Sequence, residues 1–78
     1  MRVRLPKIGT LVTVTWLDAA GYIGIPMGEA APAICNTVGW LAAINKDHVV
    51  LATSKYKDDV GDWTVLPLGV IEKCEAHK

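Results

Sequence analysis

The chain has 78 residues, of which 51% are hydrophobic, and its 8 lysines and arginines balance 8 aspartates and glutamates. This length allows one domain with a single small core. Zero net charge excludes an overall field that would draw the protein to nucleic acid or to an anionic membrane. So high an apolar content in so small a chain indicates that another subunit covers part of its surface.

The first predicted element is a strand over residues 10–17. Val12, Val14 and Trp16 alternate with other side chains there, and a period of two in β-branched and aromatic residues is typical of a strand. A long loop is expected over residues 18–36, because its glycines and prolines exclude a regular helix or a central strand.

Within this loop, residues 21–35 (GYIGIPMGEAAPAIC) are unusually apolar, because Glu29 is their only charged residue. A solvated connection of this length is normally rich in polar residues. We therefore expect the stretch to fold over the outside of the sheet or onto a neighbouring subunit.

Two apolar runs follow the loop, at residues 37–44 and 48–53, on either side of Asn45, Lys46 and Asp47. Turn-prone polar residues between two such runs predict a tight hairpin. Gly39 interrupts the first run, where a missing side chain permits a sharp bend.

Short elements are predicted for residues 54–78. Residues 54–62 are charged and contain a glycine, so we expect a solvated connection. A short strand over 63–66, a corner at 67–69 and a last strand over 70–74 follow, with a polar tail at 75–78.

These elements predict an all-β protein: one domain over residues 1–78, folded as a small five-stranded antiparallel sheet bent strongly into a barrel. The two hairpin strands are apolar on both faces, which indicates that both faces are covered. We expect the core on one side and the long loop or a neighbour on the other. Trp16, Trp40 and Trp63 are expected mostly in the core, and Tyr22 and Tyr56 are better candidates for an exposed surface.

The order of these elements resembles the SH3-like and Sm-like small barrels. GWLAAINKDHVVL is similar to the first Sm motif, with Gly39 and Leu41 matching and Ile44 in an apolar position. LPLGVI, residues 66–71, loosely resembles the second Sm motif. Among Sm-like proteins of the LSm and Hfq type, the chain most resembles small phage-encoded members.

The resemblance implies self-assembly, since Sm-like subunits form rings in which the fourth strand of one pairs with the fifth strand of the next. A homo-oligomeric ring of about five to seven subunits is the resulting expectation. The residues expected at the subunit interface are Leu66, Leu68, Val70, Ile71, Ile23 and Ile25.

The resemblance also implies binding of RNA or single-stranded nucleic acid, although key positions differ. Val49 stands where the motif has the asparagine that contacts RNA, and Leu68 stands where it has an arginine, so the usual base pocket is not preserved. The remaining candidates for contacts with nucleic acid or a partner are Asn45, Lys46, His48, Lys55, Tyr56 and Lys57. The alternative is an SH3-like module, or a structural or host-interacting phage protein, that binds proteins and no nucleic acid.

Catalysis and metal binding find little support in the sequence. Cys35, His48, Cys74 and His77 lack the close pairing of a zinc site, and no nucleophile and base form a recognisable motif. We therefore expect no enzyme, cofactor, metal or small-molecule substrate. No secretory leader or membrane-spanning run is recognisable, so a cytoplasmic protein with free thiols and no membrane partner is expected.

Overall fold

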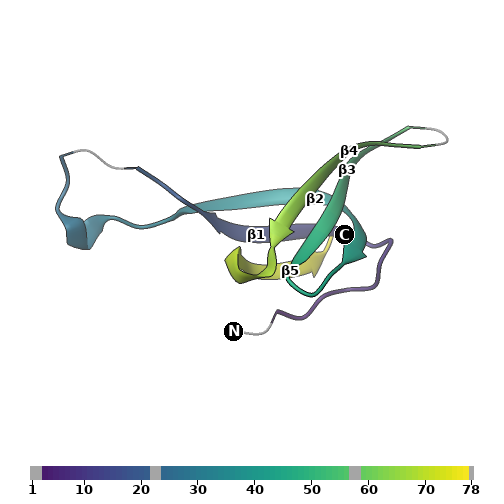
Figure 1. Ribbon diagram of the computed structural model, residues 1–78, viewed down its shortest axis with the longest axis horizontal. Helices are drawn as coiled ribbons and strands as arrows, with labels where there is room; N and C mark the ends of the chain where they lie inside the picture. Colours follow the sequence, from purple (N-terminus) through teal and green to yellow (C-terminus); the bar gives the residue numbers. More distant parts are fainter. Residues whose placement is uncertain (1–2, 22–23, 57–58, 78) are drawn as a thin grey trace.

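The computed structural model describes residues 3–21, 24–56 and 59–77. These residues form one antiparallel sheet with the strand order β4-β3-β2-β1-β5 (Figure 1). The strands are β1 (Leu11–Asp18), β2 (Ala33–Ile44), β3 (His48–Tyr56), β4 (Asp59–Pro67) and β5 (Ile71–Ala76), with 3-10 turns η1 (Met27–Glu29) and η2 (Leu68–Val70). The all-β, five-stranded prediction is confirmed.

Several predicted boundaries are wrong, among them the start of the expected polar tail at 75–78, because β5 extends to Ala76. β2 begins at Ala33, inside the expected loop, because residues 33–36 continue the ladder with β1. Most of the expected connection at 54–62 is strand, since Tyr56 pairs with Asp59 and Lys55 with Val60. The last strand begins one residue late, because Val70 lies in η2.

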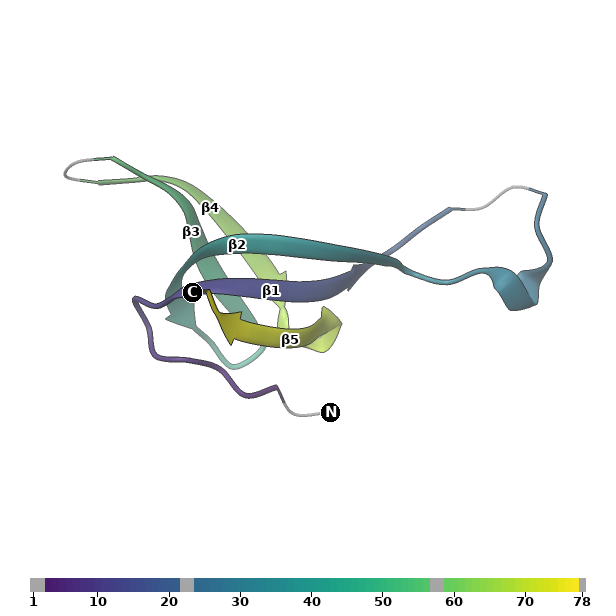
Figure 2. The ribbon, with the colours of Figure 1, turned by 180° about the vertical axis from the view of Figure 1, so that it is seen from behind.

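The core lies on the inner face of the bent sheet. All five strands contribute to it, and its buried side chains are Val12, Val14, Leu41, Val49, Leu51, Leu66, Ile71 and Cys74. Val3 and Leu5 pack against this cluster from the N-terminal segment, which runs along the open side of the sheet (Figure 2). The segment is joined to β2 where Leu41 donates its N–H to Thr10 and accepts one from Gly9.

Gly39 lies where β2 bends toward β3. A Cβ atom on Gly39 would stand 2.9 Å from the carbonyl oxygen of Ala52 and 3.3 Å from Cβ of Leu51. Glycine is therefore required at this position by the close approach of the β3 backbone.

The sheet bends strongly but does not close, since no ladder joins β4 to β5 in the described part of the chain. Past the body, β1 and β2 continue as a two-stranded ribbon, and residues 19–21 and 24–32 lie at its end (Figures 1 and 2). We call the described residues between 15 and 37 the arm. The molecule is 50 Å long and 26 by 25 Å across, with the arm at one end of the long axis and the β3–β4 hairpin at the other.

Candidate interaction surfaces

The outer face of the sheet carries exposed apolar side chains. Residues directly opposite each other in an antiparallel ladder point to the same face. Trp40 is opposite Ala52, which is opposite Trp63, and Val50 is opposite Val65. Since Leu41, Leu51 and Leu66 point into the core, these five residues point outward, and we call them the outer apolar face.

Exposure on this face is uneven. Trp63 is 56% exposed and Val65 57%, whereas Ala52 is only 1% exposed because it lies between Trp40 and Trp63 on the two neighbouring strands. Trp40 and Val50 are half-buried. Trp63 and Val65, two positions apart on β4, therefore expose apolar surface on the same face.

The arm carries a second group of exposed apolar side chains. Met27 is 91% exposed, Ile34 72% and Ile25 41%. The expectation that this stretch covers the outside of its own sheet is wrong for the described residues, because the ribbon directs the arm away from the body (Figure 1).

Local contacts hold the arm in this direction. Thr15 Oγ1 donates to Asn36 Oδ1 over 2.7 Å, and Trp16 Nε1 donates to Thr37 Oγ1 over 3.0 Å, both across the β1–β2 ladder. At the tip, η1 is closed by Glu29 N donating to the carbonyl of Pro26 over 2.9 Å. The apolar side chains of the arm are thus presented by an ordered ribbon.

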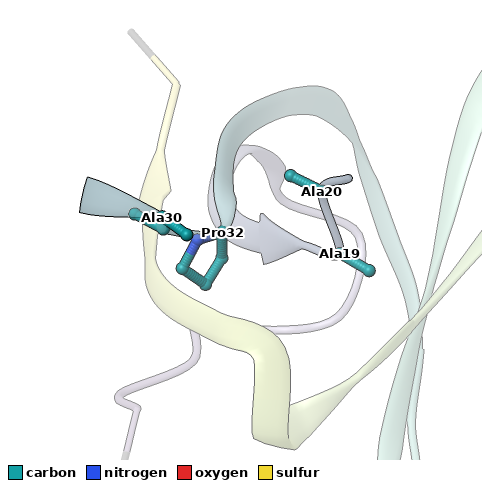
Figure 3. A pocket seen from close by; sticks show the side chains of 5 residues that line it. Ala19, Ala20, Ala30 and Pro32 are labelled. Atoms are coloured by element: carbon teal, nitrogen blue, oxygen red, sulfur yellow. The ribbon is translucent and has the colours of Figure 1, made fainter. Parts of the chain in front are cut away.

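A shallow hollow lies just beyond the last ladder pair of the arm, Asp18 and Ala33, and we call this place the neck of the arm (Figure 3). Its volume is about 300 Å³, and its lining consists of Ala19, Ala20, Ala30, Ala31 and Pro32. A site for a small polar ligand needs convergent polar side chains, and this lining supplies none. The hollow suits an apolar group instead.

The backbone of the two edge strands adds a third surface. In β4, Leu68 N donates to the carbonyl of Asp47, so by alternation Thr64 and Leu66 face β3 while the N–H groups of Trp63 and Val65 face the free edge. Pro67 continues this alternation, so its nitrogen also faces the free edge. A strand tolerates proline at such a position, because no ladder hydrogen bond is lost there.

The same alternation holds in β5. His77 N donates to the carbonyl of Leu11, so Glu75 and Lys73 face β1, and the N–H groups of Cys74 and Ala76 face the free edge. Both edges of the described sheet thus present unpaired donors and acceptors, which can pair with another strand.

The residues predicted to contact nucleic acid are divided between two places. Asn45, Lys46 and His48 lie at the β2–β3 turn, whereas Lys55 and Tyr56 lie at the far end of β3. Eight residue steps along a strand span roughly 26 Å, so the two groups do not form one patch. Lys57 lies outside the described residues, as do Tyr22 and Ile23.

The β2–β3 turn holds a short hydrogen-bonded chain of side chains. Asn45 Nδ2 donates to His48 Nε2 over 3.0 Å, which leaves His48 Nδ1 to donate to Asp47 Oδ1 over 2.6 Å. Asp47 is 82% exposed and His48 37%. No hydroxyl or thiol completes this chain among its described contacts, so it orders the turn and offers no nucleophile.

Val49 and Leu68, which align with the base-binding positions of the Sm motifs, are both aliphatic residues packed in or against the core. Val49 is fully buried, and Leu68 is half-buried against the core. Neither can offer a hydrogen bond to a base, because both are aliphatic.

The predicted interface residues play different parts. Leu66 and Ile71 are buried in the core, so their side chains are not available to a neighbour. Leu68 and Val70 are half-buried in η2, and Ile25 is exposed on the arm. Sequence reasoning missed Trp63 and Val65 as surface residues. Their signal was the alternation of 63 and 65 with 64 and 66, which places them on one face.

The two cysteines are free thiols in different settings, with Cys35 half-buried on β2 and Cys74 buried in the core. Burial raises the pKa of the Cys74 thiol. Within residues 3–21, 24–56 and 59–77, no three His, Cys, Asp or Glu side chains are grouped as metal ligands. No helix in the same ranges is long and apolar enough to cross a membrane.

Comparisons with protein-family models, with curated proteins and with solved structures find no match to this chain. The class that the fold defines is therefore a small all-β protein built on one bent five-stranded sheet.

Proposed function

We propose that this protein is a non-catalytic, self-assembling β-protein whose subunits join edge to edge in an Sm-like ring. The observation that carries the proposal is the pair of free edges on β4 and β5, which belong to the same sheet and lie at its two ends. Two different edges on one subunit give a head-to-tail contact, and such contacts close into rings when the rotation permits.

The exposed apolar side chains also support assembly. Trp63, Val65 and Met27 are each more than half exposed, and burial of each stabilises a complex by roughly 1 to 3 kcal/mol. A second copy supplies both edge strands and apolar surface. RNA binding has less support, because the cationic residues at the two ends of β3 are separated and the base-pocket positions are aliphatic.

The mass of the protein in solution tests the proposal. Wild-type protein at micromolar concentration is expected to sediment as a multiple of its 8.4 kDa chain. Ala76→Pro removes an edge-facing N–H of β5 while leaving the ladder with β1 intact, and should weaken association about tenfold or more. Ala76→Ser is the matched control, because it keeps the N–H. A single-chain mass for the wild type would refute the proposal.

Nucleic-acid binding is tested on the same assembled protein. Fluorescence anisotropy with short labelled RNA at low and high salt would show a salt-weakened complex if the ring binds RNA. Absence of binding at low salt, together with recovery of a protein partner from nuclease-treated lysate, would instead favour the protein-interaction module.

A further inference from the structure

The arm carries two charged residues, Asp18 and Glu29, among exposed apolar side chains, the outer apolar face carries none, and neither surface covers the other in the described part of the chain. We propose that the arm of one copy packs across the outer apolar face of a neighbouring copy. This inference rests on the self-assembly proposed above, but it uses side chains rather than strand edges. It therefore has a separate test.

The arm does not reach its own outer face. Its two strands remain paired up to Asp18 and Ala33, and the ladder directs residues 19–21 and 24–32 away from β3 and β4 (Figure 1). A hinge back onto the same sheet would break the ladder and its cross-strand side-chain bonds. Contact with a second copy keeps every one of these bonds.

The dimensions fit a second copy of this chain. The outer apolar face lies on three neighbouring strands, β2, β3 and β4, which together span roughly 10 Å across the sheet. The ladder of the arm from Thr15 to Asp18 alone extends roughly 10 Å along β1. An arm of this length can lie across the whole of an adjacent outer apolar face.

The chemistry of the two surfaces is matched as well. Glu29 is the only charged side chain between residues 19 and 34, and all five residues of the outer apolar face are uncharged. Neither surface carries a cation that would attract phosphate, whereas mutual burial of their apolar side chains is favourable. Met27, the most exposed apolar side chain, is unbranched and adapts to an irregular surface such as that between two indoles.

The hollow at the neck of the arm offers a complementary contact. Its small apolar lining accepts a large apolar group, and Trp63 is the largest exposed side chain of the outer apolar face. A neighbour's Trp63 in this hollow would bring the arm tip over the rest of that face.

A double-mutant cycle on association tests the contact directly. The arm variant carries Ile25→Ser and Met27→Ser, the face variant carries Trp63→Ser, and the third protein carries all three changes. Sedimentation equilibrium gives the association constant of each. Arm and face variants should each associate about tenfold or more weakly, and the combined protein should be little worse than either one, because both remove the same contact.

Ile8→Ser is the matched control, since Ile8 is 61% exposed and belongs to the N-terminal segment rather than to the arm or the outer apolar face. It should associate like the wild type. Thermal melting of each variant in its dissociated form checks that the fold is retained, because the substituted side chains lie outside the core.

The outcomes separate this inference from the ring proposal. Unchanged association of the arm variant, or strictly additive effects in the cycle, would overturn the arm contact while leaving edge pairing intact. A non-additive cycle together with an inert Ala76→Pro would support the arm contact and refute edge pairing. Wild-type protein that stays a single chain yet binds phosphatidylcholine vesicles through Ile25 and Met27 would overturn the arm contact in favour of a lipid surface.

Discussion

Gly39 on β2 and Ala52 on β3 approach so closely that a Cβ atom on Gly39 would lie 2.9 Å from the carbonyl oxygen of Ala52. Gly39→Ala should therefore push the two strands apart and lower the free energy of unfolding by about 1 to 3 kcal/mol. Chemical denaturation at low protein concentration measures this.

Gly69→Ala is the control for that change, since nothing lies within 4 Å of a Cβ at Gly69. It should be neutral or slightly stabilising. Equal losses from the two alanines would contradict the packing explanation.

Leu51 is fully buried at the centre of the core. Leu51→Ala leaves a cavity beneath β3 and should cost about 2 to 5 kcal/mol of stability. Ile8→Ala removes a similar side chain from an exposed site and should cost less than about 0.5 kcal/mol. A small effect at Leu51 would mean that the body is loosely packed.

Cys74 should make the fold sensitive to alkaline pH. Burial raises the pKa of its thiol, so the folded state holds this proton more tightly than the unfolded state does. The resulting stability is present below the ordinary thiol pKa and is lost as pH rises through the folded value. Urea titrations across this range should show a decline that is smaller in Cys74→Ala.

Thiol reactivity provides a second measure of the same burial. Cys35 should be alkylated before Cys74 in the folded protein, because the thiolate is the reactive form and Cys74 is buried. Mass spectrometry after limited alkylation distinguishes the two sites. Preferential labelling of Cys74 would show that its side of the core opens readily.

The Asp47–His48 pair should contribute little to stability despite its 2.6 Å separation. Asp47 is 82% exposed, and a hydrogen bond at so exposed a site contributes at most about 1 kcal/mol. Asp47→Ala keeps the carbonyl that accepts from Leu68 and should change stability by less than this amount. A loss of stability above about 2 kcal/mol would show that the hydrogen bonds among Asn45, His48 and Asp47 also stabilise the neighbouring segment η2.

The class of fold and most strands were predictable from local patterns. Alternation around Val12 and Val14 indicated β1, and the apolar runs around Asn45 and Asp47 indicated the hairpin. Residues 54–62 were misjudged, because strands that continue past the core are held by backbone pairing and need no apolar side chains. The start of β2 was missed for a related reason, since its partner lies far away in the sequence, on β1.

The sequence by itself determined that the predicted strands over residues 37–44 and 48–53 are apolar on both faces and that residues 21–35 are unusually apolar for a connection. Only the tertiary structure decided that these two apolar surfaces do not meet within one chain. Periodicity reports which side chains share a face, whereas the direction of the arm depends on a ladder between β1 and β2 that extends beyond the core. That ladder directs Met27 away from its own sheet and leaves Trp63 exposed.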